Sequence, residues 1–299
     1  MTETLDRRSF LQVAAALPFA LTACTSTGAG RREMQAVTEL EALESAAGVR
    51  LGVFALATED GARIAHREDE RFPFCSTFKV ILAAAILDRG TREPGLLDRR
   101  VDYTKSDLVS WSPVTEKHLD SGMTVEELCA AAIQYSDNTA ANLLIRILGD
   151  PADVTAYARS IGNQTFRLDR WETALNTAIP GDPRDTVTPR AMAGSLEVLI
   201  DGDALRPADR ERLTAWMVGN TTGNKRIRAG VPAAWRVGDK TGSGAYGTTN
   251  DIGILWPPER QPLVLAIYLT SEDEKAPWRD DVIAEATRIV VRALAGDLR

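Results

Sequence analysis

The sequence predicts an α+β protein in which an all-helical lobe is inserted into an α/β lobe. Strand-like alternation of apolar residues occurs near both ends of the chain, whereas helical periodicity dominates the middle. The 299 residues contain no repeat or low-complexity segment, and 44% of them are hydrophobic, which is enough to bury a large core. We therefore expect one compact unit of two lobes, with a five-stranded antiparallel sheet flanked by helices.

Both ends of the chain contribute to this sheet. Residues 33–47 have the apolar spacing of a helix that stops at Gly48, after which residues 51–55 alternate as in a strand. The turn Asp60-Gly61 leads into a second strand at 63–66. The C-terminal part adds three strands and a closing helix, at residues 235–241, 252–256, 263–270 and 279–295.

The segment between these strands is predicted to be helical. Thr124 and Glu127 form a capping-box pattern, and Thr188-Pro189 supplies a cap and a first-turn proline. Gly90 and Gly149 are expected to end two helices. The predicted helices cover residues 77–89, 124–135, 139–148 and 190–200.

These elements divide the chain into two lobes. We expect the α/β lobe to comprise residues 31–74 and 219–299, and the helical lobe residues 75–218. Residues with candidate chemistry come from both parts, as the motifs below show. The active site is therefore expected in the cleft where the two lobes meet.

A Ser-x-x-Lys pattern opens the first predicted helix. Ser76 and Lys79 are three residues apart, so their side chains share one helix face and an amine lies near a hydroxyl. Taken alone, the pattern also fits a surface helix with Ser76 as its N-cap. Two further motifs follow in order, Ser136-Asp137-Asn138 and Lys240-Thr241-Gly242, with the segment Arg170–Asn176 between them. This ordered set favours a nucleophilic serine over a simple cap.

The ordered set resembles the motifs of the class A serine β-lactamases. The similarity extends from Glu33 to the C-terminus and includes Trp111–His118 and Gly247–Asp251. The resemblance implies the two-lobed fold shared by serine β-lactamases and penicillin-binding proteins. It also implies hydrolysis of the β-lactam amide of penicillins and cephalosporins, and hence antibiotic resistance. The expected partners are small-molecule β-lactams, no cofactor is expected, and the chain is expected to be a monomer.

The resemblance also assigns roles in acylation. The backbone N–H groups of Ser76 and Ser243 form the expected oxyanion hole. Ser136, helped by Lys240, is expected to return a proton to the β-lactam nitrogen. Whether Lys79 or Glu172, acting through a bound water, removes the Ser76 proton is left open by the sequence. The expected catalytic residues are Ser76, Lys79, Ser136 and Glu172.

Glu172 and Asn176 are expected to deacylate the enzyme, that is, to hydrolyse the ester on Ser76. A carboxylate four residues from an amide can hold one water between them and deprotonate it for attack on the ester. This pair distinguishes a β-lactamase from a penicillin-binding D-alanyl-D-alanine peptidase, which is the closest alternative. A β-lactam sensor that keeps its acyl form is the second alternative, but the sequence predicts neither the membrane span nor the partner region that a sensor needs. Arg170 and Asp185 are expected to form an ion pair across the neck of the loop.

Substrate-binding residues are expected on both sides of the cleft. Asn138 is expected to bind the side-chain amide of the substrate and also Lys79. Thr249 occupies the position at which many relatives carry an arginine, so Arg226 is the expected guanidinium that forks onto the substrate carboxylate. Trp111 is interpreted as a cleft wall that stacks on substrate rings, with a core role as the alternative. The other residues of the anion site are Lys240, Thr241, Gly242 and Ser243.

The composition argues against two other classes of protein. A net charge of -7 and an isoelectric point near 5.1 disfavour nucleic acid as a partner, because phosphate binding needs a basic face. His66 and His118 are the only histidines, and neither has the spacing of a metal ligand. We therefore expect no metal site.

The first thirty residues predict an export signal and a tether. The pair Arg7-Arg8 precedes an apolar stretch that runs to Ala23 and is too short to span a bilayer comfortably. Leu21–Cys24 resembles a bacterial lipobox. We expect twin-arginine export and a lipid anchor on Cys24, followed by a tether at 25–30, with ordinary signal cleavage that discards Cys24 as the alternative. The expected location is the cell envelope or periplasm, with the chain either anchored or secreted.

Cys75 and Cys129 are expected to be reduced and buried. Relatives that pair a cysteine at the Cys129 position use a partner on the nucleophile helix, where this chain has Ala83. Other relatives join the Cys75 position to a cysteine just after the Lys-Thr-Gly strand, where this chain has Gly244. Neither partner is therefore present.

Overall fold

The structure is a computed structural model that describes residues 28–296. The predicted export signal, the lipobox residue Cys24 and the first residues of the predicted tether lie outside this range. No helix among residues 28–296 combines the length and the apolar content that a membrane span needs.

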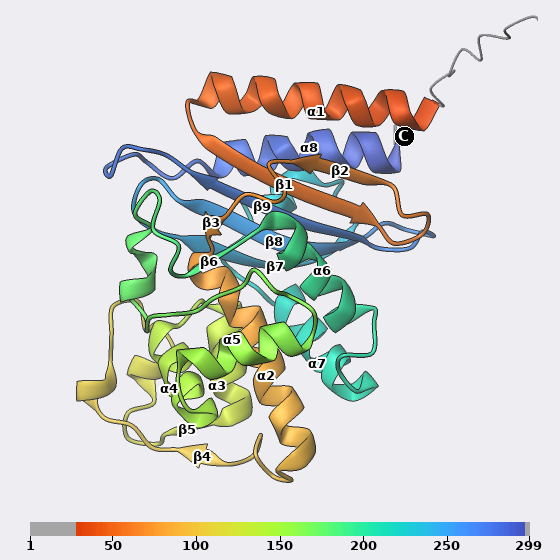
Figure 1. The fold of residues 1–299 in the computed structure, drawn as a ribbon. Helices are drawn as coiled ribbons and strands as arrows, with labels where there is room; N and C mark the ends of the chain where they lie inside the picture. Colours follow the sequence, from red (N-terminus) through yellow and green to blue (C-terminus); the bar gives the residue numbers. More distant parts are fainter. Residues whose placement is uncertain (1–27, 297–299) are drawn as a thin grey trace, which may run out of the picture.

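Five antiparallel strands form the main sheet, as predicted, in the order β2-β1-β9-β8-β7 (Figure 1). The strands are β1 (Arg50–Ala57), β2 (Arg63–His66), β7 (Arg236–Ser243), β8 (Thr249–Trp256) and β9 (Leu263–Thr270). β1 pairs with β9 along its whole length, from Arg50 opposite Thr270 to Ala57 opposite Leu263. The N-terminal and C-terminal parts of the chain therefore share one sheet.

Helices cover both faces of this sheet (Figure 1). Helices α1 (Gly28–Ala47) and α8 (Asp280–Ala295) lie side by side on one face, and α6 (Pro189–Ile200) packs on β1 and β9 from the other. The side chains of β9 alternate between the two faces: Leu265 and Ile267 join the core under α1 and α8, whereas Tyr268 joins the core of the helical lobe. Because both faces are covered, every residue of β9 is buried.

The other helices lie beside the second face of the sheet. They are α2 (Lys79–Arg92), α3 (Val125–Gln134), α4 (Asn138–Leu148), α5 (Pro151–Ser160) and α7 (Pro207–Val218). Two short strand pairs link the loops, β3 (Phe72–Pro73) with β6 (Thr186–Val187) and β4 (Arg100–Val101) with β5 (Met123–Thr124). The predicted capping box of α3 is confirmed, because the Thr124 hydroxyl accepts a hydrogen bond from the Glu127 N–H at 3.1 Å.

Two predictions about helices need correction. Gly90 does not end α2, which continues to Arg92. A side chain at Gly90 would meet only Leu97, and Arg89 pairs with Glu93 at 3.0 Å beyond it, so the glycine is accommodated within the helix. Helices α5 and α7 were not predicted, although each begins with a first-turn proline.

Strand β8 begins at Thr249, three residues before the predicted start at 252. This part of the strand was not predicted because Asn250 and Asp251 are polar and interrupt the apolar pattern. In the structure both side chains are buried and hydrogen-bonded. Asn250 Nδ2 donates to the Pro73 carbonyl at 2.8 Å, and Asp251 Oδ2 accepts from the Ile227 N–H at 3.0 Å. Burial raises the pKa of Asp251 well above its usual range, since no water solvates the carboxylate form.

Cys75 and Cys129 are buried free thiols, as predicted. Burial raises the pKa of both thiols, because the thiolate would be desolvated. Cys75, the neighbour of Ser76 in the chain, therefore stays a protonated thiol and does not compete with Ser76 as a nucleophile at neutral pH.

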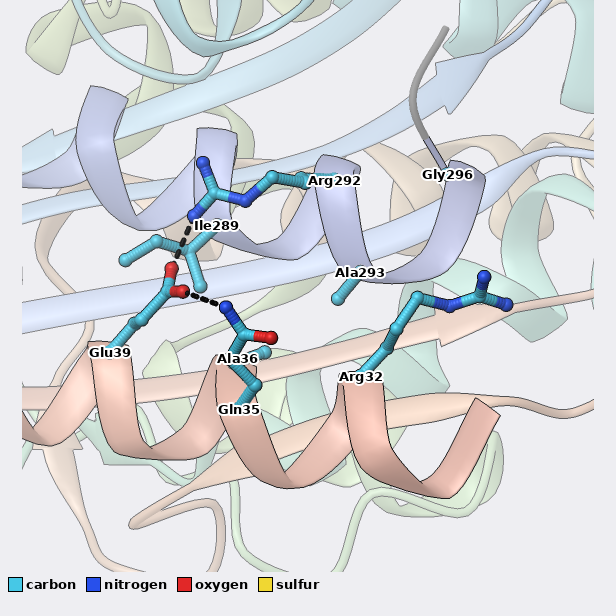
Figure 2. A pocket seen from close by; sticks show the side chains of 8 residues that line it. All are labelled: Arg32, Gln35, Ala36, Glu39, Ile289, Arg292, Ala293 and Gly296. Carbon is cyan, nitrogen blue, oxygen red and sulfur yellow. Dashed lines mark hydrogen bonds and ion pairs between the residues drawn. The ribbon is translucent and has the colours of Figure 1, made fainter. Parts of the chain in front are cut away.

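A cavity of about 280 Å³ lies between α1 and α8, on the face of the sheet away from the helical lobe (Figure 2). Three of its polar side chains bond to one another: Glu39 accepts from Gln35 at 2.9 Å and forms an ion pair with Arg292. It contains none of the residues that the sequence predicts to be functional.

Candidate active site

Ser76 lies in a short 3-10 helix, Cys75–Phe78, that leads directly into α2. The residues at the caps of these helices are Phe74 and Phe78, so the alternative reading of Ser76 as an N-cap is wrong. Strand β7 passes close to this turn, because a Cβ built on Gly242 would lie 2.7 Å from the Phe74 carbonyl oxygen and 3.2 Å from the Ser76 nitrogen. Glycine at 242 therefore allows the strand to approach the backbone of the nucleophile.

The Ser76 hydroxyl points toward the loop that carries Glu172. Its Oγ donates to Glu172 Oε1 at 3.3 Å, and both side chains are buried. Lys79 Nζ lies 2.9 Å from the Ser136 carbonyl oxygen, 2.6 Å from Asn138 Oδ1 and 3.1 Å from Glu172 Oε1. These three acceptors match the three N–H groups of an ammonium.

Lys79 has no solvent exposure, and this burial lowers the pKa of its ammonium group. The carboxylate of Glu172 acts in the opposite direction and favours the charged form. The predicted contact between Asn138 and Lys79 is confirmed by the 2.6 Å hydrogen bond. Asn138 Nδ2 also donates to the Ser110 carbonyl at 2.8 Å, which fixes the orientation of the amide.

Ser136 connects the two lobes, because Lys240 Nζ on β7 donates to its Oγ at 3.0 Å. Ser136 has a φ of 58°, in the left-handed region, between α3 and α4. Burial and the neighbouring charge of Lys79 lower the pKa of Lys240 well below its usual range. The amino groups of Lys79 and Lys240 therefore both bond to Ser136, one at its carbonyl and the other at its hydroxyl, where the helical lobe contacts the sheet.

Asp137, between Ser136 and Asn138, has a structural role that sequence reasoning missed. Its side chain caps α4 through the Ala140 N–H at 2.8 Å and accepts the N–H groups of Val114 and Thr115 at 3.0 and 2.9 Å. These bonds tie the turn that presents Ser136 to the loop that carries Trp111. The signal available in the sequence was an aspartate just before the start of a predicted helix, which is the preferred place for an N-cap.

Glu172 is held at both its backbone and its carboxylate. Asn176 Nδ2 donates directly to Glu172 Oε2 at 2.6 Å, so these two side chains, which were predicted to hold a water between them, also bond to each other. Asn142 on α4, which the sequence did not reveal, donates to the Glu172 carbonyl at 2.9 Å and accepts from its N–H at 3.0 Å. Among residues 28–296, Asn176 Oδ1 is a buried atom without a hydrogen-bond partner, so it is an available acceptor beside the carboxylate.

The loop from Arg170 to Asp185 is closed as predicted. Arg170 Nε donates to Asp185 Oδ2 at 2.5 Å, and the Asp185 carboxylate also accepts the N–H groups of Asp169 and Arg170. Desolvation of the buried Asp185 raises its pKa, and the bonds to Arg170 and Asp169 counteract this effect. The pair fixes the neck of the loop that positions Glu172.

Arg226 is buried beside the end of β7 and differs in its bonding from the prediction. Its Nε pairs with Asp280 at 2.7 Å, and its Nη1 donates to the carbonyls of Gly242 and Asn250 at 2.9 and 2.8 Å. Its Nη2 donates to Ser243 Oγ at 2.8 Å. Four of its five N–H groups are thus engaged, so Arg226 orients the Ser243 hydroxyl and is not free to fork onto a carboxylate.

The surroundings of three further positions, Trp111, Thr241 and Thr249, show which way each side chain faces. Trp111 is 63% exposed, which excludes the core alternative, and its indole N–H donates to the Tyr135 carbonyl at 3.0 Å. Thr241 is buried with its hydroxyl 2.6 Å from that of Thr222. Thr249, at the position of the arginine in many relatives, is buried and accepts the Arg279 N–H at 3.0 Å, so it faces the protein interior.

This arrangement defines a hydrolase with a serine nucleophile. No group of three or more histidine, cysteine, aspartate or glutamate side chains within residues 28–296 is placed to hold a metal ion. Ser76, Lys79, Ser136, Lys240 and Glu172 form one connected hydrogen-bond network. All five were expected from the sequence, and the structure brings them together.

Comparisons with known proteins place this site in a family. The model of the β-lactamase enzyme family matches residues 34–294. β-Lactamase Toho-1 of Escherichia coli is 53% identical over 290 residues, which is 97% of this chain and 98% of the relative. A carbapenem-hydrolysing β-lactamase KPC of Klebsiella oxytoca is 54% identical over 253 residues, 84% of this chain and 86% of the relative. The crystal structure of a β-lactamase from Desulfarculus baarsii superimposes with a TM-score of 0.87 at 55% identity, covering 88% of this chain and 98% of that one.

The chain therefore belongs to the β-lactamase enzyme family, as a class A serine β-lactamase. It is a β-lactam hydrolase, and its activity is one that gives antibiotic resistance.

Proposed function

We propose that the chain opens the β-lactam amide of penicillins and cephalosporins by forming an ester on Ser76, which a water activated by Glu172 then hydrolyses. The observation that carries this proposal is the position of Glu172, whose carboxylate bonds to Ser76 at 3.3 Å through Oε1 and to Asn176 at 2.6 Å through Oε2. One carboxylate is thus within reach of both the nucleophile and a site for water. A penicillin-binding peptidase, on which the β-lactam ester persists, does not need the contact between this carboxylate and Asn176.

In acylation, Ser76 Oγ attacks the β-lactam carbonyl carbon and the ring C–N bond breaks. The backbone N–H groups of Ser76 and Ser243 stabilise the oxyanion. The Ser76 proton passes to Glu172, directly or through a water. The bonding of Lys79 supports this route, because the three N–H groups of Lys79 bond to the Ser136 carbonyl, Asn138 and Glu172. Glu172 is therefore the group that bonds to Ser76 Oγ. Ser136 gives its proton to the ring nitrogen, and Lys240, 3.0 Å away, is placed to restore it.

In deacylation, a water between Glu172 and Asn176 attacks the ester carbonyl. Before this step, Glu172 releases to solvent the proton that it took in acylation, and Lys240 regains one from solvent. Glu172 then takes one proton of the attacking water, the C–O bond to Ser76 breaks, and Glu172 gives that proton to Ser76 Oγ, its partner at 3.3 Å. Asn176 Oδ1, which has no hydrogen-bond partner among the described residues, supports this role, because it can accept a hydrogen bond from the second O–H of that water.

The substrate carboxylate is expected to bind at Lys240, Thr241, Gly242 and Ser243, and the substrate amide at Asn138. Arg226 contributes here by orienting the Ser243 hydroxyl. Trp111, exposed and fixed by its indole N–H, is expected to stack on substrate rings.

Incubation of the purified chain with a hundredfold excess of a penicillin tests the proposal. We expect complete hydrolysis of the penicillin, and rapid-quench mass spectrometry should show a transient adduct on the peptide that contains Ser76. A D-alanyl-D-alanine peptide should not be cleaved. Stoichiometric acylation without recovery would instead indicate a peptidase or a sensor.

We also propose that the chain is exported through the twin-arginine route and lipid-anchored on Cys24. Support comes from the Arg7-Arg8 pair, the apolar stretch to Ala23 and the lipobox-like Leu21–Cys24. In a bacterial host, the Cys24→Ser variant should move from the membrane fraction to the soluble envelope fraction. Lys substitutions at both arginines should leave the chain unprocessed. Equal membrane association of the Cys24→Ser variant and the parent would contradict the anchor.

A further inference from the structure

Two tryptophans near the active site share an unusual pair of properties. Trp111 is 63% exposed and Trp278 is 60% exposed, yet each indole N–H is hydrogen-bonded to a backbone carbonyl. Trp111 bonds to Tyr135, the residue before Ser136, and Trp278 bonds at 2.9 Å to Gly244, the residue after Ser243. One tryptophan thus belongs to the helical side of the site and the other to the end of β7.

Three successive residues, 278 to 280, each bond to a residue at or beside the site. Besides the indole bond to Gly244, the next residue, Arg279, donates its N–H to Thr249 Oγ1 at 3.0 Å. Asp280 then forms the 2.7 Å ion pair with Arg226. The segment 278–280 therefore follows the end of β7 and the start of β8, and Trp278 lies next to the residues that orient Ser243.

A fixed and exposed indole is suited to contact a ligand. Holding an aromatic side chain in one orientation removes the rotamer entropy that a ligand contact would otherwise cost. A single exposed apolar side chain is common on protein surfaces, as Met34 on α1 illustrates at 61% exposure. Trp278 differs from Met34 because its indole N–H is anchored to the strand that forms the proposed oxyanion hole and carboxylate site.

We propose that Trp278 is a second aromatic wall of the cleft and contacts the C3 substituent of cephalosporins. This inference rests on the proposed carboxylate site at Ser243. In a cephalosporin, the ring carbon that carries the C3 substituent is bonded to the carbon that carries the carboxylate. A carboxylate bound at Ser243 therefore directs the C3 substituent toward the neighbouring Gly244 and the indole attached to it. A flat cationic substituent gains most, because tryptophan has the strongest cation–π face among the aromatic residues.

The test compares two cephalosporins with the same acyl side chain, one bearing a pyridiniomethyl group at C3 and the other an acetoxymethyl group. We expect Trp278→Ala to lower the ratio of their kcat/KM values, pyridiniomethyl over acetoxymethyl, about tenfold, or about 1.4 kcal/mol. Trp278→Phe, which keeps an aromatic face but loses the bond to Gly244, should retain most of the ratio. Trp278→Leu, which is apolar without a π face, should resemble the alanine variant.

Met34→Ala is the matched control, since it removes an equally exposed apolar side chain from α1 and should not change the ratio. An unchanged ratio in Trp278→Ala would overturn the proposal. Equal losses for both cephalosporins and for a penicillin would also overturn it, because Trp278 would then act only by supporting Gly244. Failure of the parent enzyme to hydrolyse the penicillin would contradict the proposed function and not this assignment.

Discussion

Replacement of Glu172 by glutamine is expected to stop the enzyme at its acyl form. Glutamine keeps the size of the side chain and can still accept the hydrogen bond from Asn176, but it cannot take a proton from water. General-base catalysis contributes about 10²- to 10⁴-fold, so we expect kcat to fall about 10³-fold. Mass spectrometry of Glu172→Gln mixed with a penicillin should show the adduct persisting for minutes.

The matched control is Glu41→Gln, which removes the same charge from an exposed position on α1. It should leave turnover unchanged and accumulate no adduct. If Glu172→Gln turned over at the parental rate, Glu172 would have no part in deacylation. Because Glu172 is also the proposed acceptor of the Ser76 proton, the adduct should form more slowly than in the parent enzyme. A variant that neither turned over nor formed an adduct would show that acylation, like deacylation, requires the Glu172 carboxylate, which lies 3.3 Å from Ser76 Oγ.

Ser76→Ala is expected to abolish both the adduct and turnover. Removal of the nucleophile of a serine hydrolase lowers kcat by about 10⁴- to 10⁶-fold, and the oxyanion donors alone sustain little reaction. The backbone N–H of residue 76 remains, so the variant should still bind the substrate. Equilibrium binding of a penicillin to Ser76→Ala, measured by calorimetry, should therefore be detectable in the absence of hydrolysis.

Ser160→Ala serves as the control, because Ser160 is exposed at the end of α5 and its hydroxyl bonds only to the Tyr157 carbonyl among the described residues. Its kcat and adduct yield should equal those of the parent. Substantial hydrolysis by Ser76→Ala, beyond what carry-over of parent enzyme explains, would mean that another group attacks the β-lactam.

The residues of the site were predictable because short motifs carry them. Ser76, Lys79, Ser136 and Lys240 were expected from three motifs in a fixed order. In the structure Ser136 bonds to Lys79 at 2.9 Å and to Lys240 at 3.0 Å, and Ser76 joins them through Glu172, which lies 3.3 Å from Ser76 Oγ and 3.1 Å from Lys79 Nζ. The five-stranded sheet was likewise expected, because apolar alternation marks its strands. Local patterns sufficed wherever the chemistry or the periodicity was local.

The supporting residues were not predictable, since they act across long sequence separations. Asn142 holds the backbone of Glu172 from 30 positions away, and Trp278 bonds to Gly244 from 34 positions away. The start of β8 was hidden because Asn250 and Asp251 are polar residues that are buried only through partners in other segments. Arg226 was placed correctly near Ser243, but its four bonds to neighbouring residues could not be read from its sequence context.

The pairing of β1 with β9 has a consequence for how the chain is made. Arg50 lies opposite Thr270 and Ala57 opposite Leu263, so the partner of an early strand is synthesised about 200 residues after it. Until then the apolar edge of β1 has only the short β2 beside it in the sheet. Contacts of such long sequence separation form late and slowly. The sheet that carries Lys240 can therefore close only after β9 has left the ribosome, so no active enzyme can exist before residue 270 has been made.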